Sequence, residues 1–393
     1  MINREIPCRR RNLTISFLVS ALLMVACSSL YGQTPQQTNR SIDNSEVDEV
    51  IDSVLSGFNI HYLYPDVAED MSAHVRKKQK DREYYDVPNL EELTGLLTED
   101  LREISQDRHI WISLMSPEDL NPTIGDTLTD EQIAARSRRN FFFKKVEWLP
   151  GNVGYLRLDR FDDPIHAGPT AVAAMNFLAN CAAVIIDLRH NGGGEEKMVR
   201  LIASYFLKEP ALLTSLYFTE TDSLEQSWTY AYVPGRKLID ADLYILTSEG
   251  TGSGAEAFSY ALKNLGRATV VGQTTGGAAH WAEYYDFPNL QVRAKIPIAR
   301  PINPITKTSW ERVGVAPTIE ASAEKALDVA YLEALENVRE RTAREIELAV
   351  IDWAIDGAKC QISPPQLSVE TLEQYVGTYG PRKITLENDV LHY

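Results

Sequence analysis

The chain has 393 residues, of which 44% are hydrophobic, and its 55 acidic and 39 basic side chains give a net charge of −16. This length and hydrophobic content allow one large domain or two to three smaller ones with a buried core, and they exclude a disordered chain. The negative charge excludes nucleic acid as a partner, because the chain would repel a phosphate backbone rather than neutralise it.

The amino terminus has the pattern of a secretory signal. The basic stretch "CRRRN" precedes an apolar run that begins at Leu13, and small and polar residues follow it. We therefore expect a signal peptide over residues 1–32 and a polar linker over residues 33–44. Cleavage after Gly32 is one route, and a lipid anchor on Cys27 is the other, since "MVAC" loosely resembles a lipobox. Either route places the mature protein outside the cytoplasm, periplasmic or secreted.

The cysteine and histidine content argues against disulfides and metals. Two of the four cysteines lie in or beside the signal, which leaves Cys181 and Cys360 for the mature chain. No disulfide framework follows from two cysteines, and Cys181 enters an apolar strand, which favours a buried thiol. The histidines and cysteines lack the spacing of metal ligands, so we expect no metal and no cofactor.

Residues 45–115 predict an amino-terminal helical subdomain. The stretches "SEVDEVIDSVLSGF" and "NLEELTGLLTEDLREI" each place their apolar residues on one helical face. Asn89, followed by Glu92, marks the start of the second helix. In "HIWISLM" apolar residues alternate, which predicts a strand directly after His109. Residues 116–145 are polar and then partly helical, and we interpret them as a connector.

Residues 146–325 predict an α/β core. "NVGYLRLDRF", "AAVIIDLR", "DLYILTS" and "ATVVGQ" read as strands, whereas "EEKMVRLIASYFL" and "AEAFSYALKNL" read as helices. Apolar strands that alternate with amphipathic helices indicate a parallel sheet covered on both faces, and reactive groups collect where such strands end. Residues 326–393 predict a long charged helix or a pair of helices, then two short strands of an incomplete β unit.

Ser253 lies at the mouth of one of these helices and allows two interpretations. With Glu256 it matches the S-x-x-E capping box, in which the hydroxyl caps the helix and does no chemistry. It also stands on a tight strand-to-helix turn between Gly252 and Gly254. Such a turn exposes the serine oxygen and the N–H that follows it, as a nucleophile requires.

The run "IIDLRHNGGGEE" places three glycines, Gly192 to Gly194, between an apolar strand and a helix. They can form a flexible turn, or they can expose backbone N–H groups that bind an oxyanion. A phosphate-binding loop is excluded, because the run has neither G-x-x-x-x-G-K nor G-x-G-x-x-G spacing.

Three passages, "VIIDLRHNGGG", "LTSEGTGSGAEAFSYALKNLGRATVVGQTTGGAAH" and "WERVGVAPTIE", follow one another along the chain. Together they resemble the consecutive signatures of the tail-specific (carboxyl-terminal processing) serine peptidases, in the branch of tricorn protease cores and the interphotoreceptor retinoid-binding protein. The resemblance spans residues 45–325 and implies a crotonase-like α/β core with an amino-terminal helical subdomain. The family often inserts a PDZ module, but only about thirty residues separate "WISLM" from "VEWLPGNVGY", so we expect none.

The resemblance implies that Ser253 is the nucleophile. It places the oxyanion donors at the Gly254 N–H and in the turn that contains Gly192 and Gly193. Many relatives use a lysine base in a "TFGKG"-like segment, whereas this chain has "TTGGA", with Gly277 at the lysine position. A serine–lysine dyad therefore cannot form from that motif.

The remaining candidate bases are histidines, which accept a proton readily near neutral pH. His109 aligns with the tricorn-like histidine before the core, and Glu311 of "WERVGV" matches the acidic residue that orients it. Taken alone, His109 could be an ordinary half-buried residue and Glu311 could pair with Arg312 at the surface. Arg108 stands where the tricorn-type site has a serine, which leaves the relay from Glu311 open. His280 is the alternative base or a substrate-binding residue.

These residues predict a secreted serine peptidase that cleaves peptide or protein substrates by acyl transfer through Ser253 with a histidine base. The alternative is a non-catalytic binder of apolar small molecules, like the retinoid-binding relatives. The absent lysine slightly favours the binder, whereas the presence of Ser253, His109 and Glu311 favours the enzyme.

Overall fold

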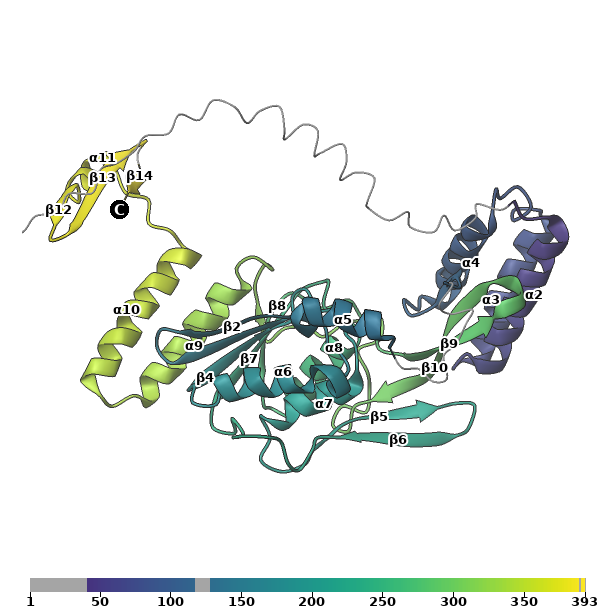
Figure 1. The fold of residues 1–393 in the computed structure, drawn as a ribbon, viewed down its shortest axis with the longest axis horizontal. Coiled ribbons are helices and arrows are strands. Elements are labelled where there is room, and N and C mark those ends of the chain that lie inside the picture. Colours follow the sequence, from purple (N-terminus) through teal and green to yellow (C-terminus); the bar gives the residue numbers. More distant parts are fainter. Residues whose placement is uncertain (1–40, 117–127, 389, 393) are drawn as a thin grey trace, which may run out of the picture.

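A computed structural model describes residues 41–116, 128–388 and 390–392 (Figure 1). The expected signal peptide, Cys27 and most of the expected linker lie outside these residues. Within them, no helix combines the length and the apolar character that crossing a membrane requires.

The amino-terminal unit consists of three helices, α2 (Asn44–His61), α3 (Pro65–Lys80) and α4 (Leu90–Ser105). Their apolar faces form one buried cluster. Asn89 caps α4 as predicted, because its side chain accepts the Glu92 N–H at 2.9 Å.

A five-stranded antiparallel sheet joins this helical unit to the rest of the molecule. It contains β1 (Trp111–Leu114), β5 (Leu212–Phe218), β6 (Ser223–Trp228), β9 (Trp281–Phe287) and β10 (Val292–Ile302). The long strand β10 pairs with β1, β5 and β9. Buried side chains of β10 belong to the cluster of the amino-terminal helices, and Figure 1 shows β9 and β10 beside α2 and α3. The sequence predicted only β1 of this sheet.

The second sheet has six strands in the order β11-β8-β7-β4-β3-β2. Their bounds are β2 Phe143–Leu149, β3 Val153–Leu158, β4 Ala183–Asp187, β7 Asp242–Thr247, β8 Thr269–Gly272 and β11 Ile319–Glu320. Strands β3, β4, β7, β8 and β11 run parallel to one another, in agreement with the predicted parallel sheet. Strand β2 is antiparallel and lies at the edge.

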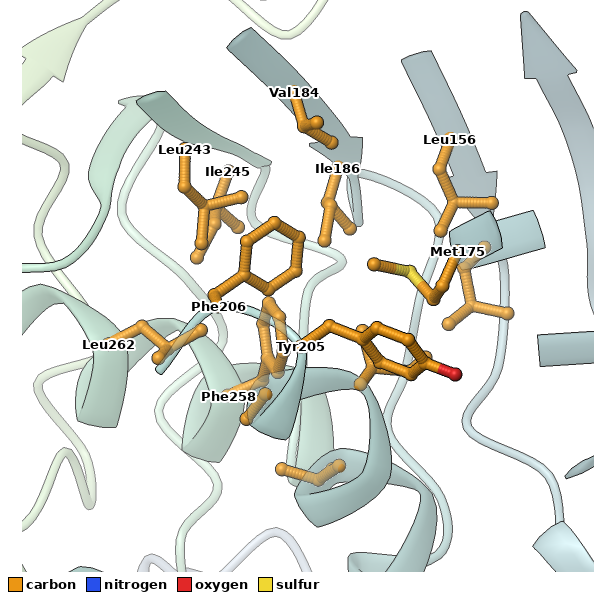
Figure 2. Close-up of a cluster of buried hydrophobic side chains, with 14 of the residues drawn as sticks. Leu156, Met175, Val184, Ile186, Tyr205, Phe206, Leu243, Ile245, Phe258 and Leu262 are labelled. Carbon is orange, nitrogen blue, oxygen red and sulfur yellow. The ribbon is translucent and has the colours of Figure 1, made fainter. Parts of the chain in front are cut away.

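Helices cover both faces of the parallel sheet, so the fold is mixed α/β. One face carries α6 (Pro164–Phe177), α7 (Glu196–Ser204) and α8 (Gly254–Asn264). Figure 2 shows Phe206, Phe258 and Leu262 in this core beside strand residues such as Ile186 and Ile245. The other face carries α9 (Ala326–Arg341), with α10 (Glu345–Ile362) packed against it.

The remaining elements are short. The expected connector contains α5 (Asp130–Arg138) and η1 (Asn140–Phe142), and η2 (Pro288–Leu290) joins β9 to β10. After α11 (Val369–Glu373) come β12 (Gly377–Tyr379), β13 (Arg382–Glu387) and β14 (Val390–His392). The prediction of two strands here was wrong. Asn388 adopts a φ of 49°, a conformation that asparagine tolerates in turns, and the chain folds back into a third strand.

Candidate active site

Ser253 occupies the turn between β7 and α8. Its φ of 48° and ψ of −118° put a non-glycine residue in a strained backbone conformation, as expected for a nucleophile elbow. The buried Glu256 carboxylate accepts the Ser253 N–H at 2.8 Å, which is the carboxylate half of the predicted capping box. The turn that presents the serine is therefore fixed through its backbone.

Glu256 also holds the neighbouring turn in place. It accepts the Gly277 N–H at 2.6 Å, the Ala278 N–H at 3.0 Å and the Thr275 hydroxyl. Burial raises the pKa of Glu256, and these hydrogen bonds oppose that rise. Because one carboxylate joins both turns, the elbow cannot shift without breaking several buried hydrogen bonds.

The glycine turn after β4 packs directly against Ser253. A Cβ on Gly193 would lie 2.8 Å from the Ser253 Cβ and 2.8 Å from the Gly254 nitrogen, and Gly193 has a φ of 112°. The Gly193 N–H donates to Asn191 Oδ1 at 2.8 Å. In contrast, no residue of the described chain accepts the Gly254 N–H. The Gly254 N–H could thus donate to a bound group without rearrangement, whereas the Gly193 N–H would first have to release Asn191.

His109 lies beside Ser253, although 144 residues separate them. Its Nε2 is 3.4 Å from Ser253 Oγ, and only 9% of its side chain is exposed. Burial, together with the charge of Lys295, lowers the pKa of His109 to about 4, although the charge of Asp107 opposes the change. The imidazole is therefore neutral at pH 7 and can accept a proton.

Asp107 lies behind His109, and the sequence analysis missed it. Its fully buried carboxylate accepts the His109 backbone N–H at 2.9 Å, and Oδ1 lies 3.9 Å from His109 Nδ1. That buried Nδ1 has no hydrogen-bond partner among the described residues. The available signal was the aspartate two positions before the histidine in "DRH". This spacing alone does not show that the two side chains lie together, because that depends on how the chain enters the strand that follows.

His280 and Glu311 lie on the far side of Asp107. His280 Nδ1 is 2.6 Å from Asp107 Oδ2, and 2% of its side chain is exposed. Glu311 Oε2 is 3.7 Å from His280 Nδ1 and accepts the N–H groups of Ala279 at 2.7 Å and His280 at 3.3 Å. Glu311 therefore contacts His280, whereas the resemblance implied that it would orient His109.

The pKa values of Asp107 and Glu311 differ from their ordinary values in opposite directions. Burial alone would raise the pKa of Asp107, but the hydrogen bond and charge of His280 and the backbone N–H of His109 bring it below its ordinary value. Burial raises the pKa of Glu311, and the charge of His280 only partly offsets this. Asp107 is thus the carboxylate of this cluster that is held in its anionic form.

The residues that differ from the lysine-type and tricorn-type patterns have other contacts. The Arg108 side chain reaches the turn that contains Gly276 and Gly277, where its Nη1 donates to the Gly276 carbonyl at 2.7 Å. Gly277 has a φ of 78°, and a Cβ there would lie 3.0 Å from the backbone of Arg312, so a lysine at this position would be strained. Lys263 donates to the Ala316 carbonyl at 2.6 Å.

Two clusters in the described chain bring three potential metal ligands within 4.8 Å of one another. In the first, Asp107, His280 and Glu311 are already joined by the contacts given above. In the second, the Lys78 ammonium lies 2.7 Å from the carboxylate of Asp100, beside His74 and Glu103. We interpret both as hydrogen-bonded and ion-paired clusters, because His280 already bonds the Asp107 carboxylate and the Lys78 ammonium already pairs with that of Asp100.

A small cavity of about 80 Å³ opens beside Ser253, and His280 contributes to its wall. The rest of the lining is mainly apolar and comes from α7, α8, the antiparallel sheet and the loop after β10, with side chains that include Val199, Leu213, Ala257, Trp281 and Trp310. The nucleophile therefore faces a space that suits an uncharged side chain of modest size.

Two family models match this chain. Residues 152–321 match the model described as "Peptidase family S41", and residues 44–138 match the "N-terminal domain of Peptidase_S41 in eukaryotic IRBP". The first match contains Ser253, Glu311 and the glycine turn after β4, and the second contains Asp107 and His109. The chain therefore carries a peptidase family S41 domain and the amino-terminal domain that accompanies it.

Individual relatives match over part of their length. The chain is 30% identical over 139 residues to a carboxyl-terminal-processing protease of Picosynechococcus sp., covering 35% of this chain and 32% of that protein. It is 34% identical over 131 residues to a carboxyl-terminal-processing protease of Synechocystis sp., covering 33% and 29%. The chain thus spans about a third of the length of these curated relatives.

A solved structure shares the fold. A lipoprotein from Streptococcus agalactiae superimposes with a TM-score of 0.52 at 16% identity, over 75% of this chain and 97% of that one. This likeness concerns the fold alone.

Proposed function

We propose that this chain is a serine peptidase that cleaves peptide bonds by acyl transfer through Ser253, with His109 as the general base. One observation carries the proposal. The neutral, buried imidazole of His109 lies 3.4 Å from the hydroxyl of a serine on a strained turn. This contact is longer than a strong hydrogen bond, but such contacts often tighten when substrate binds.

In the proposed reaction, Ser253 Oγ attacks the carbonyl carbon of the peptide and His109 Nε2 takes the hydroxyl proton. The Gly254 N–H donates to the developing oxyanion, and the Gly193 N–H joins it once it has released Asn191. His109 then returns the proton to the leaving amine. The same residue next activates the water that releases the acyl group.

The cavity beside Ser253 supports a peptide substrate over an apolar ligand. Ligand pockets usually enclose about 300–1,000 Å³, whereas this cavity measures about 80 Å³. We infer that it receives one small apolar side chain next to the cleaved bond. The alternative function, a non-catalytic binder of apolar small molecules, is less well supported by this site.

The proposal also covers location and fold type. The basic and apolar pattern of the amino terminus supports export from the cytoplasm, with either cleavage after Gly32 or a lipid on Cys27. The parallel sheet with its two glycine-containing turns supports a crotonase-like core. The short stretch between β1 and β2 supports the expectation that no PDZ module is inserted there.

Labelling with a fluorophosphonate probe tests the proposal. We expect stoichiometric labelling of the wild-type protein at Ser253 in a peptide map, and cleavage of a denatured protein mixture. Ser253→Ala should lose both activities. Ser259→Ala is the matched control, since Ser259 lies in the same helix with its hydroxyl bonded to the Ala255 carbonyl, and it should keep both. Equal cleavage by the Ser253→Ala and wild-type proteins would refute the assignment.

A further inference from the structure

A continuous series of buried groups extends from His109 away from Ser253. Asp107 follows His109, His280 follows Asp107, and Glu311 follows His280, with distances of 3.9, 2.6 and 3.7 Å between the charged or polar side-chain atoms. The exposed fractions of the last three side chains are 0%, 2% and 11%. These residues come from separate segments of the chain, before β1, before β9 and after β10. Such a buried polar series is costly unless its members satisfy one another.

We propose that Asp107, His280 and Glu311 form a positioning unit for His109, in which His280 donates to Asp107 and Glu311 holds His280. This proposal rests on the proposed function, because it assigns the residues that orient the base of that same site. It also gives His280 and Glu311 roles that differ from those considered above. His280 is neither the base nor a substrate ligand, and Glu311 acts on His109 only through the other two residues.

The hydrogen bonds around Asp107 support this order. Oδ2 accepts from His280 Nδ1 and, at 3.3 Å, from the Tyr62 hydroxyl, whereas Oδ1 accepts the His109 backbone N–H. A carboxylate oxygen can accept more than one hydrogen bond, so Oδ1 can still receive the His109 Nδ1–H. A buried N–H without a partner is destabilising, so a small rotation that closes the 3.9 Å gap is favourable. The gain is larger when the imidazole becomes charged.

Glu311 fixes the loop that carries His280. Its Oε2 accepts two successive backbone N–H groups, those of Ala279 and His280, and lies against the imidazole. His280 in turn holds Asp107 in its ionised form through a short hydrogen bond. Without His280, burial would favour the neutral acid, which could no longer stabilise a protonated His109.

The charged groups around His109 make a directional test possible. The charge of Asp107 raises the pKa of His109, whereas the charges of Lys295, His280 and Arg102 lower it. Asp107→Asn should therefore lower the pKa of His109, so that the acid limb, the fall of the Ser253 labelling rate at acidic pH, lies at lower pH than in wild type. A purely structural role for Asp107 would not shift this limb.

The main experiment is a double-mutant cycle on the full chain, read as the second-order rate of fluorophosphonate labelling at Ser253. We expect Asp107→Asn to slow labelling by about 10⁴-fold, the loss seen when a triad aspartate is neutralised. His280→Ala should slow it by roughly 10- to 100-fold, as for other residues that orient a reacting group. Because His280 acts through Asp107, the double variant should label no more slowly than Asp107→Asn alone.

Two further variants keep the test decisive if Asp107→Asn does not fold. His280→Asn places an amide N–H near the position of Nδ1 and should recover most of the rate that His280→Ala loses. His74→Ala is the matched control, because His74 also lies beside two carboxylates, those of Asp100 and Glu103, but outside this site. It should label at the wild-type rate. Thermal unfolding curves establish that each compared variant is folded.

Losses that multiply in the double variant would overturn the positioning unit, as would His280→Asn being no faster than His280→Ala. Either result, with the wild-type protein labelled at Ser253, leaves the proposed peptidase function intact. If folded wild-type protein is not labelled at Ser253, the proposed function fails and the positioning unit fails with it.

Discussion

The two halves of the candidate site are built in different ways. Ser253 and the glycine turn lie at the carboxyl ends of β7 and β4, which are neighbours in the parallel sheet. His109 lies just before β1 of the antiparallel sheet, where Trp111 pairs with Lys295 of β10. The position of Ser253 therefore depends on local strand-to-helix turns, whereas the position of His109 depends on pairing between strands that are far apart in sequence.

The two halves also differ in how tightly they are held. Several hydrogen bonds to Glu256 fix the Ser253 turn and the segment at Gly277 and Ala278. His109 has an anchored backbone, but its Nδ1 has no partner within hydrogen-bond distance in the described chain. We therefore expect the nucleophile to be rigid and the imidazole to make the adjustment when substrate binds. The following predictions test this difference, from the largest expected effect on rate to the smallest.

The largest effect should come from removing both halves together. Ser253→Ala and His109→Ala should each lower peptide cleavage by roughly 10⁴- to 10⁶-fold, and the double variant should be scarcely worse, because members of a catalytic unit are strongly non-additive. Turnover of a denatured protein substrate measures this. If His109→Ala keeps nearly full turnover while His280→Ala is inactive, His280 is the base.

A substitution at Gly193 should disturb the half of the site that contains Ser253. In Gly193→Ala the new methyl group would lie 2.8 Å from the Ser253 Cβ, at a backbone φ of 112° that disfavours alanine. We expect labelling of Ser253 to slow by about 100- to 1,000-fold, the cost of a damaged oxyanion site.

Gly192→Ala is the control for this change, because a Cβ at Gly192 meets no atom within 4 Å. It should label within a few-fold of wild type. Equal losses in the two variants would show that the whole turn is sensitive, rather than the contact with Ser253.

The pH dependence tests the buried base. Only neutral imidazole accepts the serine proton, and burial lowers the pKa of His109 to about 4. The labelling rate of the wild-type protein should therefore be constant at neutral pH and fall as the pH drops through about 4. A fall centred near 6.5, the ordinary pKa of histidine, would contradict the buried environment of His109.

The smallest effect is expected at the edge of the positioning unit. Tyr62→Phe removes one long hydrogen bond, of 3.3 Å, to the Asp107 carboxylate, which keeps its bonds from His280 and the His109 N–H. We expect a loss of about 0.5–1.5 kcal/mol in unfolding free energy and a change in labelling rate below about tenfold. Tyr85→Phe, which removes a hydroxyl bonded to Asp48, should leave the labelling rate unchanged. A large loss in Tyr62→Phe would make Tyr62 a principal partner of Asp107.

The antiparallel sheet shows why part of the fold could not be predicted. Apolar runs identified β3, β4, β7 and β8, whose side chains are buried on both faces. Strand β10, "VRAKIPIARPI", contains two prolines and three cations, features that argue against a strand in the middle of a sheet. Tertiary pairing overrides this, because β10 pairs with β1, β5 and β9 over different parts of its length.

The sequence alone determined the local chemistry, because turn geometry and helix caps depend on residues within a few positions of one another. The serine turn, the glycine turn and the Asn89 cap are of this kind. Only the tertiary structure decided which carboxylate contacts which histidine. His280 meets Asp107 across 173 residues and Glu311 across 31, and contacts of that range exist only after the strands before and after them have paired. A one-residue change in that pairing would turn the side chains to the opposite face of the sheet.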